Sequence, residues 1–398
     1  MTPPAVRPRS GHVALVAYLF AATMIGTTLP TPLYAFYSAE LDLTPLLVSI
    51  VFAAYAVGVL GTLLLLGRLS DHIGRRQVLL ATIATAAVSS VVFVVVDLAP
   101  SLPLLLVGRL VSGVSAGFAT GAFTAYLTEL SARRGRNAGL LATVVNLGGL
   151  GLGSLIAGVL AEHLPHPTLL PYLVHLGLLL PVALVFALRL PETVETTDGW
   201  RAGVKPQRLG VPPEIRVPFF AAALAALAAF SVLGFSTALA GQVLAGGLGN
   251  HSHQTVGVTA FLLLAGAVAG QVLAGRLTNR TGNLLGLGLM PVGVVVLIVA
   301  VVAKSLPLLI AAVLVAGLGV GFAFRASLGK VVSIAPAERR GEVTSTYFAG
   351  AYLGLTIPVV GSGLLVTETT LVTAVVVLAV FVGALCAVAA TIVARSQD

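Results

Sequence analysis

The sequence predicts an all-α polytopic membrane protein, with twelve transmembrane helices arranged in two pseudo-symmetric six-helix bundles. Of its 398 residues, 58% are hydrophobic and only 9% are charged, and the mean hydropathy is +1.05. A soluble globule of this size needs more polar surface than that, so the chain is expected to dissolve in lipid. Its apolar runs are continuous and lack the alternating polarity of a membrane β-barrel.

Each of the twelve apolar runs is long enough to cross about 30 Å of hydrocarbon at about 1.5 Å per residue. Many carry Gly and Ala at spacings of four, which lets helix backbones approach closely where lipid gives no hydrophobic drive to association. An even number of spans puts both termini on the same side. The predicted spans are 12–35, 43–66, 78–97, 103–127, 139–161, 168–189, 217–240, 255–274, 284–303, 306–332, 343–365 and 370–394.

The distribution of basic residues predicts the orientation. Loops on the N-terminal side of the membrane, counted with Arg189 at a helix end, hold 18 of the 22 Lys and Arg residues, whereas loops on the other side hold one, Lys304. This is the positive-inside pattern, so we expect a multi-pass protein of the cell inner membrane with both termini in the cytoplasm. The net charge of +8 then reflects topology, and we expect no nucleic acid as a partner because no soluble domain carries a basic face.

The chain divides into two related halves. The longest hydrophilic stretch, 191–216, contains four prolines and is predicted to be a cytoplasmic linker between N-terminal bundle 1–190 and C-terminal bundle 217–398. The sequence GRLSDHIGRR at 67–76 recurs as GRLTNRTGNL at 275–284, in the corresponding loop of the second half. Repeats of this kind place a substrate site at their interface, near the midplane of the membrane.

The loop at 67–77 resembles the signature G-x-L-[A/S]-D-x-x-G-R-[R/K] of the major facilitator superfamily. The matching residues are Gly67, Leu69, Asp71, Gly74, Arg75 and Arg76. The resemblance covers the whole chain and implies a secondary transporter that works by alternating access.

Two further patches are similar to the twelve-span drug:proton antiporter branch of that family. They are GTTLPTPLY at 26–34 and GLGLGSLIAG at 149–158. The second resembles the helix-packing pattern G-x-x-x-G-P-x-x-G-G and matches it at Gly149, Gly153 and Gly158. It departs at Ser154 and Ala157, where the pattern has Pro and Gly.

The signature loop is also expected to act as a latch. Gly67 and Gly74 permit a tight turn, and Asp71 is an acid among arginines, so it should have a partner. The N-terminus of the eleventh span, near Gly341, would attract a carboxylate. The resemblance further implies that Arg75 or Arg76 pairs with Glu129 at the end of the fourth span. The alternative is a solvated loop that serves topology alone.

Charged residues inside the spans are candidates for function, because each costs several kcal/mol unless it is paired or faces water. The resemblance implies proton coupling or gating for Arg109, and the alternative is a structural tie to Asp42 or Asp97. Arg325 is expected to contact substrate, because the first, fourth, seventh and tenth spans line the cavity in this superfamily. Its alternative is a tie from one helix to a carbonyl of another. Lys330 can extend its amine to the membrane surface.

No Asp or Glu lies in the middle third of any predicted span. A fixed organic cation would find no counter-ion there, so a neutral, zwitterionic or anionic amphiphile is the better expectation. The same absence leaves proton coupling without an evident carrier. The remaining candidates for substrate binding are polar residues within spans, namely Tyr34, Asn146, Gln242 and Tyr347, with Thr27 and Tyr352 as further polar candidates.

The predicted function is proton-coupled efflux of a small amphiphile or drug, as in multidrug resistance, by a monomer in the lipid bilayer. One alternative is an uptake permease for a small organic anion or sugar, and another is a transporter-like sensor without flux. The sequence has no G-x-x-x-x-G-K-[S/T] loop for ATP, so we expect neither an enzyme nor a cofactor. His251 and His253 lack further ligands nearby, so a solvated loop is expected there rather than a metal site.

Overall fold

The computed structural model describes residues 10–67, 69–131, 138–189, 192, 203 and 206–395. Within these ranges, twelve helices are long and apolar enough to cross a membrane, which confirms the expected number. The helices of the first half are α1 (Ser10–Thr28), α2 (Pro30–Leu41), α3 (Pro45–Leu66), α4 (Leu69–Ile73), α5 (Arg75–Leu98), α6 (Leu102–Ser131), α7 (Ala138–His163) and α8 (Leu170–Arg189).

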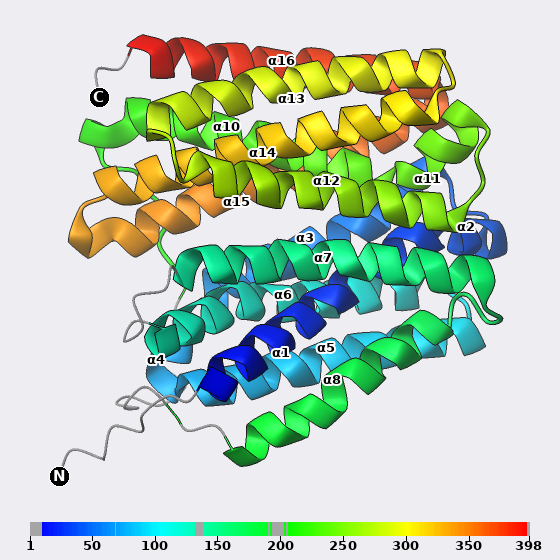
Figure 1. Ribbon diagram of the computed structural model, residues 1–398, viewed down its shortest axis with the longest axis horizontal. Helices are drawn as coiled ribbons and strands as arrows, with labels where there is room; N and C mark the ends of the chain where they lie inside the picture. The colour runs from blue at the N-terminus through cyan, green and yellow to red at the C-terminus, as the bar shows by residue number, and fades with distance from the viewer. Residues whose placement is uncertain are drawn as a thin grey trace.

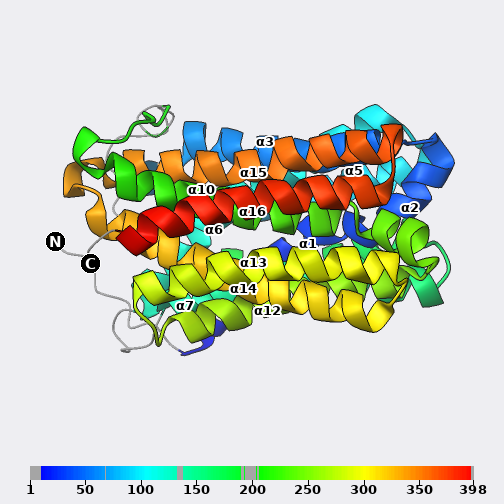
Figure 2. The same cartoon turned by 90° about the horizontal axis from the view of Figure 1, so that it is seen from above.

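The second half begins with a short 3-10 turn, Pro213–Ile215. Its helices are α10 (Arg216–Ala238), α11 (Ala240–Gln242), α12 (His253–Ala274), α13 (Asn279–Val302), α14 (Leu306–Ile334), α15 (Arg340–Glu368) and α16 (Leu371–Arg395). A π-helical segment, Val243–Leu248, follows the first long helix of this half and α11. Figure 1 shows α1–α8 gathered in one group and α10–α16 in another; most long helices run along the long axis of the molecule, and α1 and α8 slope against it. Figure 2 shows the same bundle turned by 90°.

The first span differs from the prediction because it is interrupted and extends further. The helix α1 ends at Thr28 and α2 continues to Leu41, so the span covers Gly11–Leu41 rather than 12–35. Pro30 and Pro32 have no N–H group, so they cannot donate the helical hydrogen bonds to the carbonyls of Gly26 and Thr28. The interruption therefore exposes backbone carbonyls in the middle of the membrane-spanning bundle.

The two ends of the bundle differ in charge. We call one the basic end, because the described loops and helix termini there carry Arg75, Arg76, Arg276, Arg280, Arg339, Arg340 and Arg395. At the opposite end lie Glu40, Asp42, Asp97, Glu162 and Glu368. The start of α1 and the end of α16 both lie at the basic end (Figure 1).

The halves are joined directly at the opposite end. The Glu162 carboxylate of α7 accepts from the backbone N–H of His253, at 2.8 Å, and so caps the first turn of α12. Next to it, His163 Nε2 and Gln254 Oε1 are 2.8 Å apart. The N–H of Leu46 at the start of α3 donates to Thr367 of α15, at 3.1 Å. These contacts fix the α7–α12 and α3–α15 pairs at this end.

His253 is not part of a solvated loop, which corrects that expectation for one of the two histidines. It is the first residue of α12, its ring stacks on Phe36 at a centroid distance of 4.1 Å, and its Nδ1 lies 3.2 Å from the carbonyl oxygen of Pro32. His251 is exposed, as expected. Among the described residues no group of three His, Cys, Asp or Glu side chains is placed to hold a metal ion.

At the basic end, residues 206–211 lie between the halves. The N–H of Gln207 donates to the carbonyl of Leu64 at the end of α3, at 2.7 Å. The N–H of Gly210 donates to Thr346 in α15, at 2.9 Å. Most of 191–205 lies outside the described residues, so the linker and the two domain boundaries stay predictions.

The glycines of the antiporter-like patch lie at helix contacts. A Cβ at Gly149 would lie 2.7 Å from the carbonyl oxygen of Ala21, and Gly153 packs against Ile25 and Thr28, so both let α7 approach α1. A Cβ at Gly158 would lie 2.6 Å from the carbonyl oxygen of His253 in the other half. These contacts support the predicted role in packing, both within the first half and between the halves.

We expect Gly149→Ala to lower the melting temperature of the purified protein in detergent, because the added methyl group meets rigid backbone and costs about 1 kcal/mol or more. The neighbouring Gly148→Ala is the matched control, since a Cβ there meets nothing within 4 Å. Its melting temperature should stay the same or rise. Equal melting temperatures for the two variants would contradict the close packing of α7 on α1.

Candidate functional site

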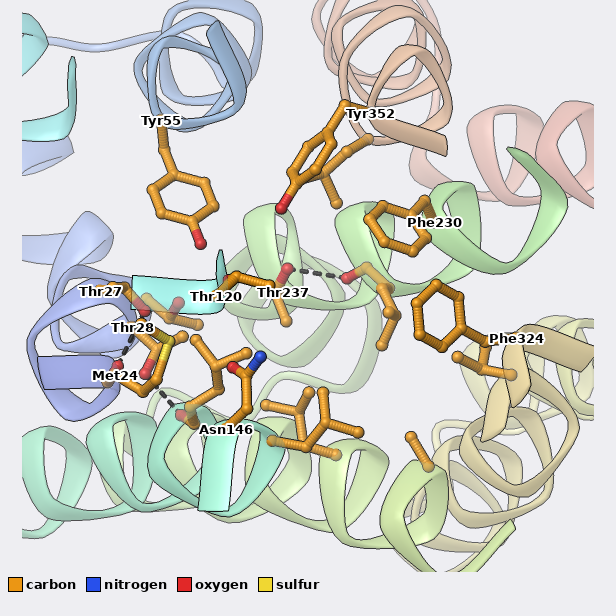
Figure 3. A pocket seen from close by; sticks show the side chains of 18 of the residues that line it. Met24, Thr27, Thr28, Tyr55, Thr120, Asn146, Phe230, Thr237, Phe324 and Tyr352 are labelled. Carbon is orange, nitrogen blue, oxygen red and sulfur yellow. Dashed lines mark hydrogen bonds between the residues drawn. The ribbon is translucent and has the colours of Figure 1, made fainter. Parts of the chain in front are cut away.

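A cavity of about 180 Å³ lies between the two halves. Figure 3 shows side chains from both halves turned toward it. Its lining comes from nine helices in eight spans, which is more than the four spans expected: α3, α7, α12 and α15 contribute as well as α1 with α2, α6, α10 and α14. The lining residues are Met24, Thr27, Thr28, Thr31, Phe52, Tyr55, Arg109, Thr120, Thr143, Asn146, Leu147, Leu150, Phe230, Leu233, Thr237, Leu264, Ala267, Gln271, Val320, Phe324, Phe348, Tyr352 and Leu355.

The lining is mainly apolar and aromatic, with a few polar groups. The hydroxyls of Tyr55 in α3 and Tyr352 in α15 point into the cavity in Figure 3. Phe230 and Phe324 form an aromatic wall on the C-terminal side, with ring centroids 5.7 Å apart. A wall of this composition binds a ligand by burying its apolar surface, while the few polar groups fix its orientation.

Arg109 is the only charged residue among the described residues that line the cavity, and it is 2% exposed. Its Nη1 donates to the carbonyl of Thr27 at 2.7 Å, next to the interruption of the first span. The guanidinium also lies over Tyr55, at 4.8 Å from the ring centroid, and over Phe52, at 5.4 Å. The Nε donor is buried without a hydrogen-bond partner among the described residues. Arg109 therefore keeps donor capacity unused beside the cavity.

The structural alternative for Arg109, a tie to Asp42 or Asp97, is not what the structure shows. Asp97 accepts from the hydroxyl of Thr168, and Arg109 donates to the carbonyl of Thr27, beside the proline-containing turn between α1 and α2. The adjacent carbonyl, that of Thr28, accepts from Ser154 of α7 at 3.4 Å. Side chains from two neighbouring helices thus satisfy backbone oxygens at this interruption.

The predicted polar residues divide into two groups. Asn146 lines the cavity, as do Thr27 and Tyr352. Tyr34 is buried near the Arg109 guanidinium, Gln242 ends the short helix α11, and the Tyr347 hydroxyl lies 2.7 Å from that of Ser327. None of these three is part of the lining. Sequence reasoning missed the aromatic wall, because an aromatic residue in an apolar span gives no signal of which face it occupies.

Arg325 also lies outside the lining. Its Nη1 donates to the carbonyl of Gln271 in α12 at 2.8 Å, and its guanidinium packs over Gly275. This is the helix-to-carbonyl tie that the sequence left open as the alternative to substrate contact. The Gly275 position is the counterpart of Gly67 in the repeat, so Arg325 fastens the second copy of the signature loop.

In the signature loop, Arg75 forms ion pairs with two acids. Arg75 Nη1 lies 2.5 Å from Asp71, and its Nε donates to Glu129 of α6 at 3.1 Å, which is the pairing expected for one of the two arginines. Arg76 instead donates to the carbonyl of Ala187 in α8. Gly74 has φ +104°, which a residue with a side chain rarely adopts.

Two details of the latch differ from the expectation. Asp71 pairs with Arg75 of its own half, whereas the expected partner was the start of α15. In the first turn of α15 the acid is Glu342, which pairs with Arg339 at 2.7 Å. A residue that sequence reasoning missed, Glu192, accepts from the N–H groups of Arg75 and Arg76 at 2.8 and 3.0 Å and so caps α5.

The cavity lies in the middle of the bundle. Thr143 and Phe348 line its side nearer the basic end, and Thr31 and Phe52 line its side nearer the opposite end. The direct hydrogen bonds between helices of the two halves described above lie at the opposite end. Two helical groups joined at one end around a central cavity are the arrangement typical of a membrane transporter.

The comparisons with known proteins agree with this class. The family model of the Major Facilitator Superfamily matches residues 14–246, which is more than half of the chain. The chain therefore belongs to the major facilitator superfamily, and it is a multi-pass membrane protein and a transporter rather than an enzyme.

One curated relative is the class G tetracycline resistance protein of Vibrio anguillarum, 40% identical over 104 residues. The match covers 25% of this chain, and the chain spans only 25% of that relative's length. Among solved structures, the bacterial homologue of the human lysosomal transporter Spinster, in its inward-facing and unoccupied conformation, has a TM-score of 0.74 at 16% identity, covering 98% of both chains. A mutant of the nucleoside transporter NupG has a TM-score of 0.73 at 10% identity, covering 95% of this chain and 99% of that one. These structures share the fold.

We expect Asp71→Asn to remove most transport while the protein stays folded in the membrane. The Asp71 side chain is 55% exposed, so its ion pair contributes only about 0–1 kcal/mol to stability, yet it fixes Arg75 between the signature loop and α6. Transport and melting temperature are compared with those of Glu338→Gln, which removes another exposed acid at the basic end. Normal transport by Asp71→Asn would reject the latch.

Proposed function

We propose that this transporter works by alternating access and exports a small neutral, zwitterionic or anionic amphiphile in exchange for protons. The observation that carries the proposal is the lining of the cavity: apolar and aromatic, with a single buried guanidinium and, among the described residues, no carboxylate. The aromatic surface suits an amphiphile, and the guanidinium sets the sign of charge that the cavity accepts.

The electrostatic argument concerns desolvation. A fixed cation that enters the cavity loses its water and meets Arg109 without a nearby carboxylate, and at low effective dielectric this repulsion is large. An anion or a polarised carbonyl is instead attracted by the Arg109 guanidinium beside the cavity. Selection by charge therefore rests on one residue, which makes it testable.

The arrangement of the halves supports alternating access. The Glu162 cap on α12 and the bond from Leu46 to Thr367 join the halves at the opposite end, and the cavity lies between the halves. These bonds come from few residues, so rocking of one half against the other can exchange them for contacts at the basic end.

Export is favoured over uptake by the partial match to a tetracycline resistance protein, whose name refers to resistance. An uptake permease for an organic anion or sugar stays the second candidate, because Arg109 and the tyrosine hydroxyls suit such a ligand too. A sensor without flux is the third, and a flux measurement separates it from the other two.

We place the protein in the cell inner membrane with the basic end and both termini in the cytoplasm, as the positive-inside rule requires. Reporter fusions after residue 200 and at the C-terminus should then both give the cytoplasmic signal. A fusion in the loop that contains His251 should give the periplasmic signal and serves as the control. A periplasmic signal from either of the first two would reject this topology.

The experiment that tests the function measures resistance and flux together. A drug-sensitive strain that expresses the protein is exposed to tetracycline and to a panel of anionic, neutral and cationic amphiphiles. The compounds that it tolerates better are then tested with purified protein in proteoliposomes carrying a pH gradient. Proton-dependent flux of neutral or anionic compounds supports the proposal, whereas flux limited to fixed cations, or no flux at all, contradicts it.

We expect Arg109→Gln to relax the selection by charge. Transport of the cation ethidium should rise relative to the anion carboxyfluorescein, and Arg109→Lys should restore the preference only in part, because an ammonium group cannot reproduce the stacked guanidinium. The matched control is Arg325→Gln, which removes a similar bond from Nη1 to a helix carbonyl outside the cavity. It should lower the melting temperature without changing the ratio. An unchanged ratio in Arg109→Gln would contradict the role of Arg109.

A further inference from the structure

His175 of α8 is a titratable side chain buried inside the N-terminal half, at 1% exposure. Its ring lies between α1 and α5. The Nε2 atom is 2.9 Å from the carbonyl oxygen of Ala22, and the Nδ1 atom is 2.7 Å from the hydroxyl of Ser90. Neither the cavity lining nor the latch includes it.

These two contacts determine where the neutral imidazole carries its proton. A carbonyl oxygen only accepts, so Nε2 must donate to Ala22. Nδ1 then has a free electron pair, and the hydroxyl of Ser90 donates to it. The single basic nitrogen of His175 therefore faces a hydroxyl group that can turn and become an acceptor.

The position of His175 links it to the cavity through one segment of α1. A Cβ at Gly26 would lie 2.7 Å from Nε2, so the ring rests on the backbone of α1 at that glycine. Gly26 also borders a small hydroxyl-lined space together with Thr27, Ser112 and Ser115. Thr27 in turn lines the main cavity, and its carbonyl accepts from Arg109. Movement of this segment thus changes the surroundings of His175 and of Arg109 together.

A buried aromatic layer separates His175 from the opposite end. Tyr172, three residues before His175 on α8, stacks on Phe93 at a centroid distance of 4.8 Å. Its hydroxyl lies 3.1 Å from that of Tyr37. All three side chains are at most 1% exposed, so in this state no water-filled route from that end reaches the imidazole.

We propose that His175 is the proton-binding site of the transport cycle. The proton binds at Nδ1 from the opposite side of the membrane when the halves separate there, and when they close it leaves Nδ1 for water on the side of the basic end. An N–H bond forms and breaks at one atom. Ser90 accepts from Nδ1–H in the protonated form and donates to Nδ1 in the neutral form, so no further reactant is needed. This inference rests on the proposed proton-coupled export.

The charged and titratable groups around His175 explain why the described state favours release. Asp97 of α5 lies toward the opposite end and accepts from Thr168. Arg109 of α6 is a cation that donates to Thr27, next to the glycine of α1 on which the His175 ring rests. The other titratable groups of α1, α7 and α8 are His12, Tyr18, Glu162, His163, Tyr172 and Arg189, and the hydrogen bonds of the imidazole go to Ala22 and Ser90 instead. A charged His175 would therefore be a buried cation without a counter-ion, which is strongly unfavourable.

Opening of the opposite end changes this balance. In this proposal the opening includes a shift of α2 against α5 and α8 within the N-terminal half, which displaces the layer of Tyr37, Phe93 and Tyr172 and lets water reach the ring. Hydration favours the charged form of an imidazole. Proton binding thus stabilises the state open to that end, and closure expels the proton, which is the coupling that an exporter driven by external protons requires.

The test uses the whole protein in proteoliposomes with tetracycline as the probe. Wild type should accumulate tetracycline up to about tenfold across a pH difference of one unit if one proton exchanges for one molecule, since each unit is a tenfold activity ratio. His175→Gln cannot titrate, but its amide can still donate to Ala22 and accept from Ser90. Accumulation should then fall to about onefold, whereas exchange of labelled for unlabelled tetracycline at equal pH should persist within about threefold.

His251→Gln is the matched control, because it removes an exposed histidine at the opposite end, and it should leave both readings unchanged. Accumulation by His175→Gln at the wild-type level would overturn the inference alone. If His175→Gln loses both accumulation and exchange, whether its melting temperature is unchanged or lowered, His175 has a structural role. That result would also overturn the inference. Exchange without accumulation by wild type would overturn proton-coupled export, and the inference with it.

Discussion

The interruption of the first span at Pro30 and Pro32 is the constraint on which the site depends. Neither proline can donate a backbone hydrogen bond, and in a lipid-facing bundle a carbonyl without a donor costs several kcal/mol. Neighbouring helices supply donors at this turn: Ser154 reaches the carbonyl of Thr28, which Pro32 leaves without its helical donor, and Arg109 reaches the adjacent carbonyl of Thr27. A charge that would be unfavourable inside a membrane is thereby held beside the central cavity, where substrate can meet it.

Close packing of small residues lets the same helices move as groups. Gly149 and Gly153 bring α7 against α1 within one half, and Gly158 brings α7 against α12 of the other half. Helices that meet through backbone make short, shallow contacts, so the interface between halves can be exchanged without unpacking large side chains. The polar bonds at its end, from Glu162 and Leu46, are few enough to break in a transport cycle.

Some site residues were predictable because their chemistry is conspicuous in an apolar chain. Arg109 and Asn146 were singled out from the sequence as polar groups inside spans, and both line the cavity. Arg325 was equally conspicuous, yet it fastens Gly275. The sequence cannot tell which of the two arginines lines the cavity. Each donates to a helix carbonyl, and only the rotation of its helix decides whether the side chain faces the cavity. Glu192 was missed for a related reason: a hydrophilic stretch between spans gives no signal that one of its acids caps α5.

By itself, the sequence determined the class of protein, the number of spans and the family resemblance. These follow from hydropathy, from helix length against membrane thickness, and from a loop whose glycines and charges are constrained locally. The tertiary structure decided which residues share a space: that Tyr55 and Tyr352 face one cavity from two halves, that Asp71 pairs with Arg75, and that His175 lies between α1 and α5. The rotation of each helix about its axis decides such contacts, and that rotation depends on the packing of all its neighbours, which no single span encodes.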